Sequence, residues 1–430
     1  MTVIEIKKAV QWFALAFLGA CATSGMGTAP SPAYPLLATG SGGTNRSDQL
    51  AKPYVVLVSF DGFRGDYLDH YTAPNFQRFA RQGVRATGLI PGFPSKTFPN
   101  HISIVTGEYP GTHGIVANTF FDPQRNETYS IGQPKTVNDG SWYKGEPIWV
   151  TAEKQGMVTE SYFWVGSEAA IEGIRPSHTK AFPDSSTKSE RVDSVLTWLR
   201  QPAEQRPHLV MLYMSDVDGA GHRYGPDDPH VQTALLAVDS ALGRLMDGIQ
   251  MLPFHDRVYV VLVSDHGMMS YTPQTAVTIS SLIDTTGIRT GDVGPNAHFY
   301  ISGGAERATI IRDSLNRHLQ HGHAYLRSEI PARLHYNSDP RNGDVVVIMD
   351  EHYQIVRRIP AESGGNHGWD PKYPSMYGIF LVEGPGIKSG ATIDPFENVQ
   401  IYPLLAEILG LKSAPGVEGK AGWLRQAVMR

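Results

Sequence analysis

The stretch YVVLVSF, residues 54–60, is a continuous run of residues that favour β-strands. A run without polar alternation is typical of a strand that is buried on both faces, as in a parallel sheet. Asp61 and Gly62 follow directly, and ligands of such sheets bind where the parallel strands end. The stretch therefore predicts a buried strand with a functional side chain at its carboxyl end.

Similar apolar runs and helical patterns alternate along the rest of the chain. The runs lie at residues 209–214, 258–263 and 377–382, and helices are expected at 73–82, 148–154, 189–200, 231–249 and 401–409. This alternation predicts an α/β fold, with a doubly wound, mostly parallel sheet sandwiched by helices. Residues 275–357 interrupt it with mixed strand and helix signals, and we interpret them as an inserted α+β cap. The catalytic core would then comprise residues 53–274 and 358–430.

The N-terminal residues predict export. Lys7 and Lys8 precede a short apolar run, residues 9–20, that is typical of a signal peptide. The run ends in LGAC, where Cys21 is the only cysteine of the chain. This sequence resembles the bacterial lipobox, in which the cysteine is lipidated; the alternative is an ordinary signal peptide with a chance cysteine. We therefore expect a signal peptide over residues 1–21 and a flexible linker over 22–52.

The residue after Cys21 bears on localisation. Ala22 is not the aspartate that signals retention at the inner membrane. We therefore expect a periplasmic protein with a lipid anchor in the outer membrane, and no other contact with a membrane.

Composition limits the partners of the protein. The chain has 430 residues, of which 41% are hydrophobic and 18% charged, as in ordinary globular proteins. Its net charge is −5 and it has no basic block. We expect no binding to duplex nucleic acid, which requires a basic surface.

Acidic and imidazole residues lie where the apolar strands end or begin. They are Asp61, Asp218, His222, Asp265, His266 and His367. Any one of them has a simpler explanation, because an aspartate after a strand often caps a helix. Together they converge on one edge of the sheet, where aspartates would repel each other unless a cation lies between them. Mixed carboxylate and imidazole ligands predict zinc.

A candidate nucleophile lies between the first two of these motifs. In PSKTFPNH, residues 94–101, a helix should begin near Pro99, because proline favours the first helical turn. Thr97 would then lie at a helix N-terminus, whose N–H groups bind phosphate. Thr97 could merely cap the helix, but the nearby metal motifs favour a nucleophile activated by zinc. We interpret His101 and His113 as hydrogen-bonded structural residues.

These residues occur in motifs that together resemble the nucleotide pyrophosphatase/phosphodiesterase family of the alkaline phosphatase superfamily, in its bacterial type. The motifs are VLVSFDGFRGDYL (57–69), FPSKTFPNHISIVTGEYPGTHGIVANTF (93–120), GEPIWVTAEKQG (145–156), SDVDGAGHRYGP (215–226), VLVSDHGM (261–268) and GGNHGW (364–369). The resemblance implies one zinc ion bound by Asp61, Thr97, Asp265 and His266, and a second bound by Asp218, His222 and His367. It also implies that Asn118 and the backbone N–H of Phe98 bind a phosphate oxygen.

The resemblance predicts a two-zinc phosphodiesterase or pyrophosphatase that releases nucleoside 5′-monophosphates through a phosphothreonine. The alternatives are a phosphonate hydrolase of the phosphonoacetate type, a hydrolase of lipid-headgroup phosphodiesters, and a surface lipoprotein that binds metal or nucleotide without turnover. Asp216 stands where related sequences often carry glutamate, which leaves the choice of substrate open.

We expect diesters to be preferred over monoesters. A monoester dianion needs an added cation, and residues 97–118 contain no arginine or lysine. Lys96 adjoins the nucleophile, but neighbouring side chains of extended backbone point apart. Phe98, Phe182 and Tyr213 could stack a nucleobase; for Phe182 and Tyr213 the alternative is an ordinary core aromatic.

Overall fold

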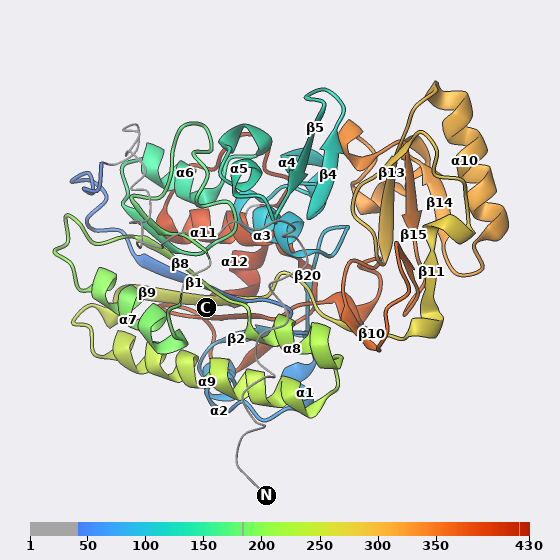
Figure 1. The fold of residues 1–430 in the computed structure, drawn as a ribbon. Coiled ribbons are helices and arrows are strands. Elements are labelled where there is room, and N and C mark those ends of the chain that lie inside the picture. Colours follow the sequence, from blue (N-terminus) through green and yellow to red (C-terminus); the bar gives the residue numbers. More distant parts are fainter. Residues whose placement is uncertain (1–41, 183–184, 421) are drawn as a thin grey trace, which may run out of the picture. The chain divides into compact units, whose positions relative to one another are not determined.

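The computed structural model describes residues 42–182, 185–420 and 422–430, and Figure 1 shows their fold. Among these residues the central sheet has eight strands in the order β19-β2-β18-β9-β1-β8-β6-β7. The strands are β1 (Tyr54–Phe60), β2 (Val84–Ala86), β6 (Thr159–Tyr162), β7 (His178–Lys180), β8 (Leu209–Met214), β9 (Val258–Val263), β18 (Phe380–Glu383) and β19 (Ala391–Ile393). Cys21, with the predicted signal peptide and most of the predicted linker, lies outside the described residues.

Strand β1 lies at the centre of the sheet and explains why its sequence is apolar throughout. It pairs in parallel with β8 on one side and with β9 on the other. Its residues alternate between two cores, with Val55 and Leu57 in one and Val56 and Val58 in the other. Burying each such side chain contributes about 1.5–3 kcal/mol, so a polar residue would be costly on either face. The predicted doubly buried strand is confirmed.

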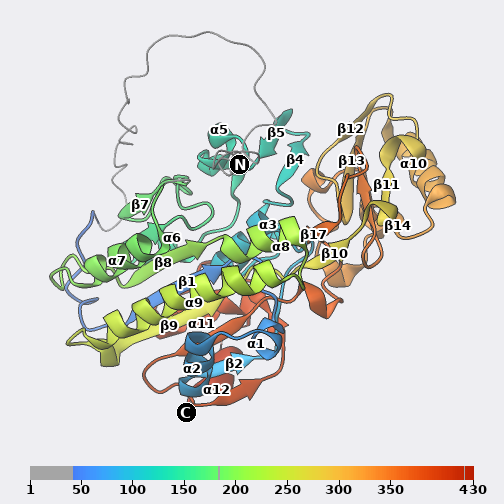
Figure 2. The same ribbon diagram turned by 60° about the horizontal axis from the view of Figure 1, so that its bottom comes forward.

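Helices cover both faces of the sheet (Figures 1 and 2). The helices α2 (Pro74–Gln82), α7 (Lys188–Leu199) and α9 (Pro229–Gln250) pack on one face, and α3 (Thr97–Thr106), α6 (Ile148–Lys154) and α11 (Ile401–Leu409) on the other. Local sequence fixes where they begin: α7 starts with a capping box of Thr187 and Glu190, and α2 and α9 start with proline. The predicted doubly wound α/β fold is confirmed.

Strand β18 is the one reversed strand of the described sheet. It pairs antiparallel with β9 and with β2, whereas the other pairings are parallel. Its beginning therefore lies at the edge where the parallel strands end. His367, which precedes β18 in the chain, reaches the same edge as Asp61 for this reason.

The expected insertion forms a second sheet with its own core. Its strands β12 (Ile288–Thr290), β13 (Asn296–Ile301), β15 (Val345–Ile348) and β14 (His323–Leu326) pair antiparallel in that order, and α10 (Gly304–His318) packs on them. The short pair of β11 (Ala276–Thr278) and β16 (Gln354–Val356) joins its two ends. Figure 1 shows this α+β insertion beside the core in orange.

The chain also contains smaller α-helices and strands. They are α1 (Tyr67–His70), β3 (Leu89–Ile90), α4 (Pro110–His113), β4 (Thr119–Asp122), β5 (Glu127–Ser130), α5 (Pro134–Val137), α8 (Asp216–Tyr224), β10 (Met269–Tyr271), β17 (Gly364–Asn366), β20 (Phe396–Glu397) and α12 (Trp423–Val428). None of the helices in the described residues is long and apolar enough to cross a membrane.

Candidate active site

Strand ends bring the predicted metal ligands together. Asp61 follows β1, and Asp265 with His266 follows β9, the strand beside it. The Nε2 atom of His266 lies 3.0 Å from Asp265 Oδ2 and 3.4 Å from Asp61 Oδ1. These three side chains are almost completely buried.

Gly62 allows the backbone at Asp218 to approach the backbone at Asp61. Gly62 has a φ of +66°, and a Cβ there would lie 2.8 Å from the Cα of Asp218. Only glycine tolerates both conditions. The N–H of Asp218 can therefore donate to the carbonyl oxygen of Asp61 at 3.0 Å.

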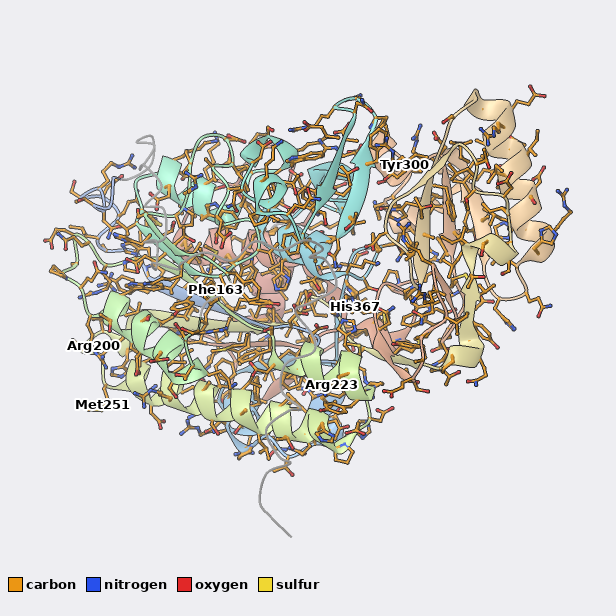
Figure 3. All side chains as sticks on the ribbon, in the orientation of Figure 1. Phe163, Arg200, Arg223, Met251, Tyr300 and His367 are labelled. Carbon is orange, nitrogen blue, oxygen red and sulfur yellow. The ribbon has the colours of Figure 1, made fainter. Side chains whose placement is uncertain are left out.

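Helix α8 carries two of the predicted ligands on one face. Asp218 and His222 are four residues apart, and His222 Nε2 lies 3.3 Å from Asp218 Oδ1. His367, after β17, completes this group, with its Nε2 3.1 Å from that of His222. Its ring stacks on the ring of His266 with centroids 3.5 Å apart. Figure 3 labels His367 between the core and the insertion that carries Tyr300.

The three histidines are held in one tautomer. Their Nδ1 atoms lie 2.8–2.9 Å from backbone carbonyl oxygens, those of Gly365 for His222, Gly267 for His266 and Ser95 for His367. A carbonyl oxygen only accepts, so each Nδ1 carries a proton, and in the neutral ring each Nε2 presents a lone pair to the cluster. Hydrogen bonds of this kind orient the imidazole rings that bind metals in proteins.

The carboxylates of the cluster present free acceptors as well. Asp61 Oδ1, Asp218 Oδ1 and Asp265 Oδ2 are buried atoms without a hydrogen-bond partner. Burial, together with the charges of Asp265 and Asp218, raises the pKa of Asp61 well above its usual value. Converging acceptors with no donor are costly unless a cation lies among them, so the chemistry of these residues fits bound metal.

The groups of neighbouring ligand atoms coincide with one of the two predicted sets. Asp218, His222 and His367 form one group. The other two groups are Asp61, His101 and Asp265, and Asp61, Asp218 and His266. His266 Nε2 lies near both Asp61 and Asp265, so the second predicted set stays a prediction. His101 lies near Asp265, but its ring nitrogens hydrogen-bond with Ser59 Oγ and the carbonyl of Thr97, as the sequence indicated for a structural residue.

Thr97 lies beside this cluster. It is the first residue of α3, which begins two residues before Pro99, and Lys96 is the N-cap residue. The N-cap residue makes no side-chain cap hydrogen bond, and Thr97 Oγ1 lies 3.2 Å from His266 Nε2. The alternative that Thr97 merely caps the helix is therefore wrong.

Two candidate phosphate-binding groups lie next to Thr97. The backbone N–H of Phe98 donates to Asn118 Oδ1 at 3.1 Å. Both groups therefore face the helix N-terminus, and rotation of the carboxamide would present the Asn118 NH₂ group instead.

Residues 55–370 match the family described as Type I phosphodiesterase / nucleotide pyrophosphatase. The chain belongs to this family. It is 36% identical over 378 residues to bovine ectonucleotide pyrophosphatase/phosphodiesterase family member 3, covering 84% of this chain and 43% of that protein. An uncharacterized pyrophosphatase/phosphodiesterase of Schizosaccharomyces pombe is 33% identical, covering 87% of this chain and 80% of that protein.

A solved structure of the same family is similar along most of the chain. Murine ectonucleotide pyrophosphatase/phosphodiesterase 5, an inactive threonine-to-alanine variant in complex with AMP, superposes with a TM-score of 0.83 at 28% identity. The match covers 88% of this chain and 100% of that one. By contrast, this chain spans 43% and 40% of the bovine member 3 and human member 1 proteins.

The three predicted stacking residues of this phosphodiesterase-family chain differ in how much of the side chain is exposed to solvent. Tyr213 is only 8% exposed, and its hydroxyl donates to Asp61 Oδ2 at 2.5 Å. Little of its ring is therefore exposed to solvent, which favours the alternative of a core aromatic over stacking. Phe182 is 52% exposed with its ring 6.1 Å from that of Tyr213, and Phe98 is half-buried against Tyr129.

The insertion contacts the loop that carries Asn118. The sequence did not predict these contacts. Buried Arg341 donates to the carbonyls of Gly114 and Trp142 and to Asp122 at 2.8–2.9 Å. Tyr336 donates to Val116 O at 2.6 Å. These partners are more than 190 residues apart in sequence, so no local pattern could have predicted them.

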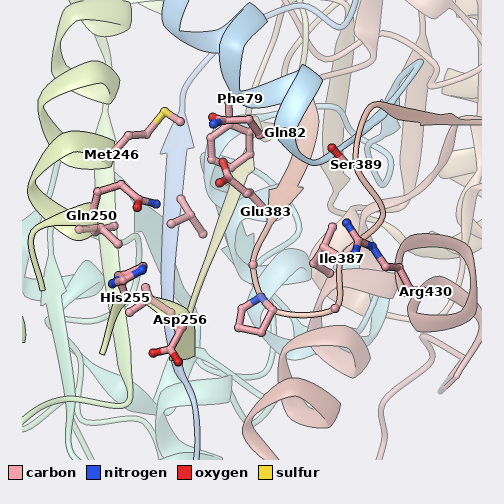
Figure 4. Close-up of a pocket in the computed structure, with 16 residues that line it drawn as sticks. Phe79, Gln82, Met246, Gln250, His255, Asp256, Glu383, Ile387, Ser389 and Arg430 are labelled. Carbon is pink, nitrogen blue, oxygen red and sulfur yellow. The ribbon is translucent and has the colours of Figure 1, made fainter. Parts of the chain in front are cut away.

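A pocket of about 420 Å³ lies at the opposite edge of the sheet (Figure 4). Its walls include the start of β9 at Val258 and the end of β18 at Glu383. Burial raises the pKa of Glu383 there. None of the metal-ligand candidates lines this pocket, so it is separate from the candidate active site.

Proposed function

We propose that this chain is a two-zinc phosphodiesterase or pyrophosphatase that hydrolyses nucleotide diesters or pyrophosphates to nucleoside 5′-monophosphates. The observation that carries the proposal is the convergence of three imidazole lone pairs and three unpartnered carboxylate oxygens beside the hydroxyl of Thr97. Family membership and the AMP complex of the murine relative support it.

Two sets of residues would hold the metal ions. One comprises Asp61, Thr97, Asp265 and His266, and the other Asp218, His222 and His367. Bound zinc would stabilise a threonine alkoxide and the charge that develops on the phosphate oxygens.

The residues of the chain then perform a double displacement. Thr97 Oγ1 forms a bond to phosphorus as the bond to the leaving alcohol or phosphate breaks, which gives a phosphothreonine. Water attacks the same phosphorus from the opposite side, and the bond from phosphorus to Thr97 Oγ1 breaks. A proton from the water returns to Oγ1, and the nucleoside monophosphate is released. The Phe98 N–H, Asn118 and the N-terminus of α3 hold the phosphate oxygens. His101 fixes the Thr97 backbone through the Thr97 carbonyl oxygen.

The charges around the site favour a diester. Lys96 pairs with Asp292 at 2.8 Å, Lys188 with Asp216 at 2.5 Å and Arg64 with Asp66 at 2.6 Å. A monoester dianion, or the carboxylate of a phosphonoacetate-type substrate, would need a cation that these acidic partners already neutralise.

A substrate comparison tests this proposal. We expect kcat/KM to fall in the order nucleoside 5′-diester, bis-p-nitrophenyl phosphate and p-nitrophenyl phosphate. Phe98→Ala or Phe182→Ala should reduce the advantage of the nucleoside by about 5- to 150-fold, because base stacking contributes about 1–3 kcal/mol. Trp423→Ala, which removes a similarly exposed aromatic of α12, is the control.

The outcomes separate the alternatives. A parent enzyme that prefers the monoester contradicts the proposal. A diester preference that does not depend on the base favours a lipid-headgroup hydrolase, tested with glycerophosphocholine. Turnover of phosphonoacetate alone favours a phosphonate hydrolase, and no turnover favours a metal- or nucleotide-binding lipoprotein.

We also propose export to the periplasm and lipid anchoring at Cys21, as the sequence predicts. Cys21→Ser should block lipidation and move the protein from the outer-membrane fraction to the soluble periplasmic fraction. Unchanged processing and membrane fractionation would show that the lipobox prediction is wrong.

A further inference from the structure

Lys96, the residue before the proposed nucleophile, forms an ion pair with the insertion. Its Nζ lies 2.8 Å from Asp292 Oδ2, and the two side chains are 7% and 19% exposed. The pair is thus largely shielded from solvent. A shielded charge acts on its surroundings more strongly than a surface charge, because water screens it less.

The lysine side chain lies against a loop of the active site. A Cβ at Gly368 would come within 2.8 Å of Lys96 Cε, and Gly368 directly follows the proposed ligand His367. Asn296 donates to the carbonyl oxygen of Gly368 at 2.6 Å. The ammonium group therefore lies where the insertion meets the proposed metal site, on the residue adjacent to Thr97.

The backbone of the insertion holds Asp292 in place. Asp292 lies in the loop between β12 and β13, flanked by Gly291 and Gly294. Gly291 donates to the carbonyl oxygen of His298 at 2.9 Å, and Gly294 exchanges two 2.8 Å hydrogen bonds with Ile355. The carboxylate is thus pre-positioned for Lys96.

The pair is one of several contacts that anchor the insertion. Arg341 pairs with Asp122 at 2.8 Å, Lys144 with Asp339 at 2.5 Å, and Arg333 with Asp370. Anchoring alone therefore does not require a lysine beside the nucleophile. What distinguishes the Lys96–Asp292 pair is the position of its positive charge.

We propose that Asp292 is a specificity-determining residue, which neutralises Lys96 and thereby disfavours dianionic monoesters relative to monoanionic diesters. This inference rests on the proposed function and deepens it. Coulomb energy falls only with the inverse of distance, so the ammonium group can act on a phosphate at Thr97 without contacting it. With Asp292 present, that attraction is largely cancelled.

The test compares Asp292→Asn with the parent, both loaded with zinc and matched for metal content per chain. The ratio of kcat/KM for p-nitrophenyl phosphate to that for bis-p-nitrophenyl phosphate should rise about tenfold in the variant, because one buried charge is unmasked. Asp339→Asn, which removes another carboxylate that links the insertion to the core, should leave the ratio unchanged.

A double-mutant cycle separates charge from structure. Lys96→Met removes the ammonium group and keeps a long side chain, so Asp292→Asn should change the ratio little in that background. A binding readout without turnover compares Thr97→Ala with Thr97→Ala/Asp292→Asn. Calorimetry should show that the double variant binds AMP more tightly than the single variant does, and that both bind bis-p-nitrophenyl phosphate equally.

Each outcome decides the inference. An unchanged ratio in a folded Asp292→Asn protein overturns it, as does an equal change in the Lys96→Met background. If Asp292→Asn alone fails to fold, the test uses the Lys96→Met background. The monoester-to-diester ratio of kcat/KM must then be nearly the same in Lys96→Met/Asp292→Asn as in Lys96→Met. A parent enzyme that prefers the monoester instead overturns the proposed function on which the inference rests.

Discussion

Replacing Thr97 with alanine is expected to lower kcat for the preferred diester by at least about 10³-fold, because loss of a nucleophile removes the covalent route. The fold and the metal content should change little. Thr97 is the first residue of α3 but not its N-cap, and among the described residues its Oγ1 hydrogen-bonds with His266. Single-turnover kinetics, circular dichroism and elemental analysis measure the three quantities.

Two comparisons make this result specific to the hydroxyl of Thr97. Thr97→Ser keeps a hydroxyl at the same position and should retain part of the activity. Thr106→Ala removes a threonine from the other end of α3, where Oγ1 donates to Ile102 O at 2.7 Å, and should affect stability rather than kcat. Inversion of configuration at a chiral phosphorothioate diester would contradict the covalent mechanism, since two displacements give net retention.

The apolar strands of the core could be predicted closely because burial dictates their sequence. The runs at 54–60, 209–214 and 258–263 coincide with β1, β8 and β9. The last run predicts a strand over 377–382, but β18 begins at Phe380. Gly378 bridges to Arg64 and Leu89 instead, in close contact with Ser264.

Strand β6 could not be predicted from apolar patterning, because its sequence is TESY and its polar side chains are buried. Hydrogen-bond partners outside the strand make this burial tolerable. Glu160 accepts from His178 at 3.0 Å and from Gln201 at 3.2 Å, and Ser161 donates to Ser167 at 2.8 Å. Patterning predicts a strand only where burial requires apolar residues.

The same distinction applies to the site. The six carboxylate and imidazole residues lie close in sequence to the ends of the apolar strands, so the sequence could indicate where they meet. The contacts that modify them join distant residues: Tyr213 with Asp61 and Lys96 with Asp292 are 152 and 196 positions apart. Such pairs depend on the tertiary fold and leave no local pattern, which is why the sequence alone leaves stacking and a core position open as alternatives for Tyr213.

Removal of metal is expected to abolish turnover, and zinc is expected to restore it with two ions bound per chain. The physical reason is the cluster of unpartnered carboxylate oxygens and imidazole lone pairs, which bound cations would satisfy. Elemental analysis and titration of the chelated protein with zinc measure stoichiometry and recovery. Asp218→Asn should cost at least about tenfold in zinc affinity or activity, whereas Asp193→Asn, at an exposed ion pair with Arg244, should cost nothing.

Stability should respond to zinc in a pH-dependent way. Burial and neighbouring carboxylates raise the pKa of Asp61 in the folded chain. Without metal, protonated Asp61 therefore stabilises the folded state at acid pH. This stabilisation is lost as the pH rises through the pKa of Asp61 in the folded chain. Zinc takes the place of that proton, so it should raise the Tm more at about pH 7.5 than at about pH 5. Equal Tm gains at both values, or active protein that holds no stoichiometric metal, would contradict a metal site built on Asp61.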